Sequence, residues 1–223
     1  MKIVIQIVLW VVIVFLGYQL YNSINGPIKF NKVKEERYAK VIDNLKDISA
    51  AELAYQELVG KFTGSFDTLV RFVDTAQFAV TSRRDTSFAD VEKNKAFGLD
   101  PQTGGYYKEA SIIDTLGFVP VRDSLFGGTD RYKKMMEIPL EGIDDKIELE
   151  SGQIIKNDIK YSVFRARVHK DIMLSDLNND LLLQEKQTVS VEGVNGQYLQ
   201  VGSLDDINTS GNWPKKFDFA KKQ

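Results

Sequence analysis

The chain contains one histidine, His169, and no cysteine, which limits the chemistry its side chains can perform. Without thiolates, a zinc site around His169 would need carboxylate or water ligands, an uncommon set. His169 alternates with Arg165 and Arg167 in a β-prone stretch, a spacing that favours a solvent-facing position on a strand. One histidine would suffice for a serine–histidine–aspartate triad, but the sequence has no Gly-x-Ser-x-Gly elbow. The sequence therefore predicts no catalytic residue.

Acidic residues offer a second kind of site. The run from Asp176 through Asn178 to Asp180 matches the alternating oxygen ligands that open a calcium loop. The sixth position is Leu181 instead of glycine, and the twelfth is Gln187 instead of glutamate, so the match is incomplete. The pairs Asp144-Asp145 and Asp205-Asp206 are interpreted as turn acids. The glycine pairs at 104–105 and 127–128 lack the Lys-Ser/Thr of a phosphate loop. We predict no metal site and no cofactor.

Composition narrows the class of protein. Charged residues make up 27% of the 223 residues and hydrophobic residues 43%, as in globular domains. The formal net charge is only −2, so composition gives no sign of nucleic-acid binding. The absence of cysteine excludes disulfides but fits either side of a bacterial membrane. The length accommodates one anchor and one domain.

The first two dozen residues predict a transmembrane anchor. Residues 3–16 are aliphatic or aromatic except for Gln6, and an extension through Tyr18, Leu20 and Tyr21 to Ile24 gives about 22 residues. At about 1.5 Å per residue, a helix of this length crosses the hydrocarbon layer of a bilayer. A cleaved signal would have a shorter apolar core and a site flanked by small residues, which is not evident after Gly17. We therefore predict an anchor at 1–24, which contacts the lipid bilayer through residues 3–24, and a soluble α+β domain at 25–223.

The segment after the anchor predicts further helices. Asn25-Gly26-Pro27 is typical of a helix interruption. From 31 to 59, apolar residues recur every three or four positions, as on one face of an amphipathic helix, and Gly60 is a suitable terminator. This stripe is interpreted as core packing, with a coiled coil as the alternative. A short helix is expected at 65–74. The polar stretch 83–107 is expected to be a long irregular excursion with a helical turn near 90–97.

The second half predicts an antiparallel sheet. β-prone runs are expected at 118–121, 135–140, 146–149, 161–168, 188–192 and 197–201. Asn195-Gly196 predicts a hairpin turn between the last two runs. Asp176 to Lys186 predicts a helix, with Ser175 or Asp176 as its N-cap. The fold expected is α+β, in which the transmembrane helix continues into an amphipathic helix packed on an antiparallel β-sheet.

In the segment from Leu45 to Phe62, an alanine-rich stretch with Tyr55 leads to Gly60-Lys61-Phe62, and a short helix containing Leu69-Val70 follows. This order resembles that of type IV pilins and secretion pseudopilins. The chain departs from the family at its start: Met1-Lys2-Ile3 has no prepilin-peptidase glycine, and no glutamate follows nearby. The resemblance, which covers about the first 75 residues, implies a pilin-like fold in an envelope protein without polymerisation into a pilus.

Two observations give conflicting predictions for the side of the membrane on which the soluble domain lies. Lysines and arginines gather after the anchor, at Lys29, Lys32, Lys34, Arg37 and Lys40, and the positive-inside rule would place the domain in the cytoplasm. The pilin resemblance implies export instead. We expect a single-pass protein of the bacterial inner membrane with a periplasmic domain, acting as a non-enzymatic scaffold that binds other envelope proteins. The alternatives are a membrane-tethered enzyme with an acidic site and a cytoplasmic binding module.

Overall fold

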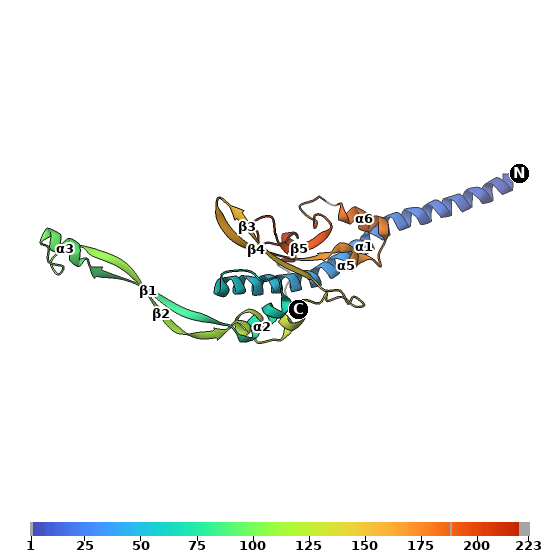
Figure 1. The fold of residues 1–223 in the computed structure, drawn as a ribbon. Helices are drawn as coiled ribbons and strands as arrows, with labels where there is room; N and C mark the ends of the chain where they lie inside the picture. The colour runs from blue at the N-terminus through green and yellow to red at the C-terminus, as the bar shows by residue number, and fades with distance from the viewer. Residues whose placement is uncertain (1, 188, 219–223) are drawn as a thin grey trace. The chain divides into compact units, whose positions relative to one another are not determined.

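The computed structural model describes residues 2–187 and 189–218 and is α+β. It combines a long N-terminal helix with antiparallel sheets of two and three strands (Figure 1). Two compact units can be distinguished, one formed by residues 1–72 and 130–223 and the other by residues 73–129. We refer to them as the helix unit and the ribbon unit.

Helix α1 is continuous over Lys2–Val59, through the predicted interruption at 25–27. Pro27 lacks the N–H that would bond the carbonyl of Ser23, but the helix tolerates this single loss. Nearby, the Asn25 side-chain amide donates to the Tyr21 carbonyl at 3.1 Å, which gives that carbonyl a donor. The expected end of the helix is confirmed: Gly60 has φ 83°, a left-handed conformation that glycine adopts without strain.

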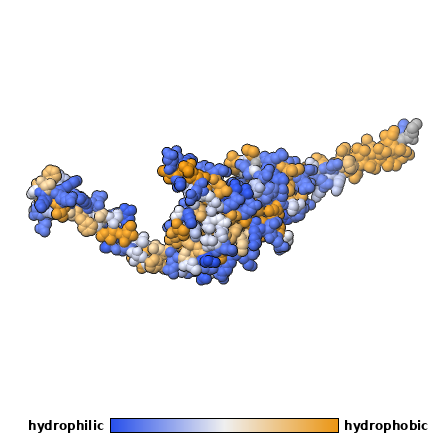
Figure 2. Space-filling model, in the orientation of Figure 1, coloured by the Kyte–Doolittle hydropathy of each residue, from blue (hydrophilic) through white to orange (hydrophobic). Residues whose placement is uncertain are grey.

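Among the described residues, α1 is the one helix long and apolar enough to cross a membrane. Its first part is fully exposed and hydrophobic, and Figure 2 shows the apolar surface of this segment giving way to a polar one. Burial starts at Phe30, which is 6% exposed. From there to Ala54 one face is buried, as the apolar spacing predicts: Tyr38, Val41, Ile42, Leu45, Ile48, Ala51 and Ala54.

The helix unit also holds a three-stranded sheet in the order β3-β4-β5, from strands Glu148–Lys156, Ile159–His169 and Tyr198–Gly202. Parts of α1 lie within contact distance of β4 and β5. Short helices α5 (Lys170–Leu174) and α6 (Asn179–Lys186) follow β4. The remaining short helical segments of this unit are η1 (Arg131–Lys134) and η2 (Lys215–Phe217). Helix α2 (Phe66–Thr75) confirms the helix expected at 65–74 and extends across the boundary between the two units.

Two of the predicted strands were wrong, whereas the runs at 161–168 and 197–201 fall on β4 and β5. The run 135–140 contributes only an isolated bridge, from Glu137 to Lys146, because η1 and tight turns surround it. Residues 189–192 form no strand, and Thr188 lies outside the described residues. The predicted hairpin at Asn195-Gly196 is absent because Asn195 Oδ1 accepts from the Ser190 N–H at 2.8 Å and closes a local loop. β5 pairs with β4 instead.

The hairpin turn lies between β3 and β4, where Lys156 pairs with Ile159. Its two loop residues, Asn157 and Asp158, have φ of 52° and 62°. Positive φ at both positions is the backbone of a type I′ turn, for which asparagine and aspartate are suited. The predicted helix at 176–186 starts three residues late, at Asn179, because Asn178 is the N-cap that accepts from the Asp180 and Leu181 N–H groups.

In the ribbon unit, the prediction of an irregular excursion at 83–107 was wrong, because much of this stretch lies on paired strands. Strands β1 (Gln77–Ala89) and β2 (Tyr107–Pro120) pair antiparallel along their whole length, with one register shift next to Val80. Helix α3 (Val91–Phe97) confirms the helical turn expected there and closes the end of the ribbon. Helix α4 (Val121–Phe126) follows β2. The run expected at 118–121 is confirmed in part, because β2 ends at Pro120. Most of the remaining ribbon escaped prediction because an exposed two-stranded ribbon buries neither face and so lacks apolar alternation.

Candidate functional site

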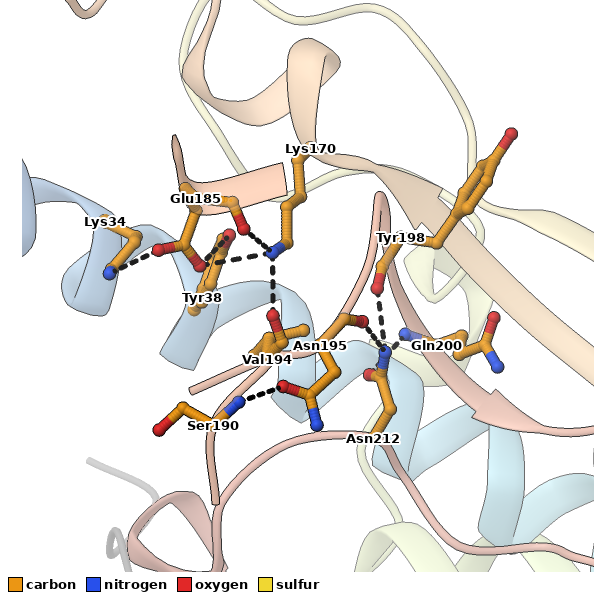
Figure 3. A network of polar contacts seen from close by, with 10 residues as sticks. All are labelled: Lys34, Tyr38, Lys170, Glu185, Ser190, Val194, Asn195, Tyr198, Gln200 and Asn212. Carbon is orange, nitrogen blue, oxygen red and sulfur yellow. Dashed lines mark hydrogen bonds and ion pairs between the residues drawn. The ribbon is translucent and has the colours of Figure 1, made fainter. Parts of the chain in front are cut away.

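Lys170, at the start of α5, is a buried basic residue of the helix unit with no exposed surface. Figure 3 shows its ammonium group pointing at the end of α6 and at the loop before β5. Nζ donates to the Glu185 carbonyl at 2.7 Å, to the Val194 carbonyl at 2.8 Å and to Glu185 Oε1 at 3.2 Å. An ammonium has three donors, so all of them are used.

Glu185 connects this lysine to α1. Its Oε2 lies 2.8 Å from Lys34 Nζ, and its Oε1 accepts from the Tyr38 hydroxyl at 3.3 Å. Burial lowers the pKa of Lys170, an effect that the Glu185 carboxylate opposes. Burial and the same carboxylate both raise the pKa of Tyr38, so its hydroxyl stays protonated and donates. The cluster joins α1, α5 and α6 through a buried charge pair.

The contacts of this cluster fit a structural role, in which it holds three helices together, better than a role as a reactive centre. A nucleophilic lysine needs a free lone pair and access to a substrate. The ammonium of Lys170 is saturated by acceptors and buried. A small cavity of about 60 Å³ lies beside the cluster, and its lining includes Lys34, Tyr38 and Glu185. That volume is far below the several hundred Å³ of a typical small-molecule site.

The other residues singled out from the sequence also have defined partners. His169 ends β4 and caps α5, accepting from the Asp171 N–H at 3.2 Å, and its ring lies edge-on to Tyr198. Its half-buried side chain is therefore engaged with neighbours rather than simply facing solvent. The arginines that alternate with it form pairs with β3, Arg165 with Glu150 at 2.6 Å and Arg167 with Glu148 at 2.7 Å. The pKa of Glu150 is lowered mainly by its hydrogen bond from Arg165.

The side chains of the incomplete calcium loop, Asp176, Asn178 and Asp180, do not form a common metal site among the described residues. Asp176 pairs with Arg37, whose Nη2 donates to Oδ2 at 2.7 Å, and this bond lowers the pKa of Asp176. Asn178 is occupied in capping α6. Of the turn acids, Asp206 pairs with Lys156 at 3.1 Å. Within the described residues, no group of three or more histidines or acids is placed to hold a metal ion.

The ribbon unit offers a different kind of surface at the end closed by α3. The loop there is built by Asn94, whose side chain donates to the Tyr106 carbonyl at 2.9 Å and accepts from the Tyr106 N–H. Asp90 caps α3 by accepting from Lys93 N–H, and Gly98 ends the helix in a left-handed conformation. The end of the ribbon is thus an ordered structure with its own internal bonds.

This ordered end carries exposed apolar side chains, which we call the tip patch: Val91 (72% exposed), Phe97 (66%), Leu99 (42%) and Tyr106 (48%). The Phe97 and Tyr106 rings contact each other with centroids 5.7 Å apart. Phe97 and Tyr106 are thus adjacent exposed apolar side chains, and contiguous exposed apolar surface is characteristic of interaction sites. The sequence predicted a long excursion at 83–107 with a helical turn near 90–97, and the apolar residues of the tip patch lie within this stretch. The burial of Lys170 had no sequence signal.

Comparisons with models of known families, with curated proteins and with solved structures gave no match. The resemblance to type IV pilins therefore stays a prediction.

Proposed function

We propose that the chain is a single-pass membrane protein of a bacterial envelope assembly, where it acts as a non-enzymatic scaffold that binds a partner protein through the tip patch. The observation that carries the proposal is the exposure of Val91 and Phe97 on α3, a helix capped by Asp90 and Gly98. Such side chains are stabilised when a complementary apolar pocket removes them from water, at about 25 cal/mol per Å² of apolar surface.

The membrane part of the proposal rests on α1. The exposed, apolar first part of α1 has the length and hydropathy of a transmembrane segment. Since α1 runs without a break into the buried stripe, the anchor and the amphipathic segment form one continuous helix. We infer that the amphipathic part of this helix packs on the sheet in a pilin-like way. The proximity of α1 to β4 and β5 supports this, and so does the contact of the Phe62 and Phe164 rings at 4.7 Å.

Affinity capture from mildly solubilised membranes tests the binding role. The wild-type chain should recover a defined partner, and the variant V91S/F97S should lose it. A matched control is I155S/I159S, which removes two exposed apolar residues, 69% and 54% exposed, from the β3–β4 hairpin. Equal recovery by all three chains, or a loss in the control alone, would show that the tip patch is not the binding surface.

The side of the membrane has two candidate answers. We place the soluble part in the periplasm, following the pilin resemblance. The lysines after the anchor favour a cytoplasmic binding module instead. A C-terminal alkaline phosphatase fusion is active only after export, and a fluorescent-protein fusion of the cytoplasmic type fluoresces only inside. Activity of the second fusion alone would overturn the periplasmic placement and keep the scaffold role.

A further inference from the structure

A group of lysines follows the apolar part of α1 directly. Between Ile3 and Lys34 the sequence contains no acidic residue, and Lys29, Lys32 and Lys34 are the cations that follow the apolar segment. Lys34 is committed to Glu185. Lys29 and Lys32 are exposed and make no hydrogen bond or ion pair with the described residues of the chain.

The two lysines lie on the side of α1 away from its buried stripe. They are three residues apart, and neighbouring positions of a helix are turned by about 100°. Lys29 and Lys32 therefore share a side, while Phe30 and Val41 lie on roughly the opposite one. These two residues are buried, at 6% and 0% exposed. The helix unit leaves the lysine pair uncovered.

The distance from the membrane follows from the continuity of α1. With about 1.5 Å per residue, Lys29 and Lys32 lie about 8 and 12 Å beyond Ile24, the last apolar residue of the anchor. The headgroup layer on each side of the hydrocarbon is about 5–8 Å thick. Lysine side chains at helix ends extend back towards this layer. Because α1 has no break at 25–27, a flexible stalk does not separate the lysines from the bilayer.

We propose that Lys29 and Lys32 bind the phosphate groups of anionic phospholipids and so form a lipid-binding site at the membrane exit of α1. The site rests on the proposed membrane anchoring. Anionic headgroups are favoured because neither lysine has an acidic partner among the described residues. Glu35, the nearest acid along the chain, is paired with Lys216 at 2.6 Å, and Glu36 forms no ion pair with either lysine. Lipid binding there fixes the depth of the anchor and the height of the helix unit above the bilayer.

The test uses the full chain in nanodiscs with equal amounts of phosphatidylcholine and phosphatidylglycerol, followed by native mass spectrometry of the lipids it retains. The wild type should retain more phosphatidylglycerol than phosphatidylcholine. In K29Q/K32Q the ratio of the two retained lipids should fall about fivefold for each lysine replaced. K29R/K32R should keep it. The control K61Q/K160Q removes two exposed lysines located beyond the other end of α1 and should behave as wild type.

The outcomes separate this site from the anchor itself. Equal retention of the two lipids by the wild type, or an unchanged preference in K29Q/K32Q, overturns the lipid site while the embedded chain keeps its proposed role. Extraction of the wild type from membranes by alkaline carbonate would overturn the anchor, and the lipid site with it. A second measurement on the wild type needs no variant: the preference should fall at high salt, and a preference insensitive to salt contradicts the proposal.

Discussion

Glu52 is a fully buried carboxyl group on α1 with an incomplete set of partners. Its Oε2 accepts from the Thr63 N–H at 2.9 Å, whereas Oε1 is buried without a hydrogen-bond partner among the described residues. Burial raises the pKa of Glu52 to about 8, against an ordinary value of 4.5. The folded protein therefore holds a proton on this group at pH values where the unfolded chain releases it.

The expected consequence is a loss of stability as pH rises. Because the folded-state pKa is the higher one, the folded chain binds more protons between pH 4.5 and about 8, and the free energy of unfolding falls across this window. Each pKa unit corresponds to about 1.4 kcal/mol, so the total loss approaches about 5 kcal/mol. E52Q keeps a neutral side chain at all pH values and should remove this loss. Denaturant unfolding from pH 5 to pH 9 measures it, and parallel pH profiles for both chains would contradict the prediction.

Lys170 allows a second prediction, because it is the buried charge that joins three helices. In K170M the acceptors Glu185 and the Val194 carbonyl lose their donor in a buried place, which should cost about 3–5 kcal/mol. The neighbouring variant K186M breaks only a partly exposed pair with Asp171 and should cost less than about 1 kcal/mol. In a double-mutant cycle, adding E185M to K170M should cost clearly less than E185M alone. Additive costs would mean that the two charges are not coupled.

At the scale of elements, the turn between β3 and β4 gives the clearest prediction. Asp158 has φ 62°, a conformation that costs a residue with a Cβ but not glycine. D158G produces the Asn-Gly pair preferred in type I′ turns and should stabilise the chain by about 0.5–1 kcal/mol. D158A should destabilise it by a similar amount. Thermal unfolding distinguishes them, and a lower stability for D158G than for D158A would refute the turn assignment.

Local sequence patterns predicted some elements of the fold and missed others. Helix periodicity on α1 identified the buried stripe and its end at Gly60, because one face of this helix is buried. The last hairpin was misplaced because Asn195-Gly196 has the stronger local turn signal, while Asn157-Asp158 is the turn that the sheet pairing uses. Pairing between β4 and β5 depends on residues about thirty positions apart, which local patterns do not encode. Of the candidate site, the sequence predicted the helical turn near 90–97, which carries part of the tip patch, but not the exposure of its apolar side chains.

On the scale of the whole chain, the division into two units predicts that the ribbon can be shortened without loss of the helix unit. Contacts inside 73–129 separate from those of the rest, so each unit has its own internal support. Thr81 and Thr115 are direct partners in the ribbon. Replacing residues 82–114 by Asn-Gly therefore joins a paired position through a two-residue hairpin turn. The tip patch is removed, and the strand register next to the turn is kept.

This shortened chain should unfold with the same midpoint as the wild type when followed by the fluorescence of Trp213, which belongs to the helix unit. A difference in unfolding free energy above about 1 kcal/mol would show that the ribbon supports that unit. In the capture experiment the shortened chain should recover no more partner than V91S/F97S. If it recovers less, the flanks of the ribbon contribute to binding, and the tip patch alone does not account for it. The two measurements distinguish a binding role of the ribbon from a folding role. If the ribbon serves only in binding, its removal lowers partner recovery and leaves the unfolding midpoint unchanged.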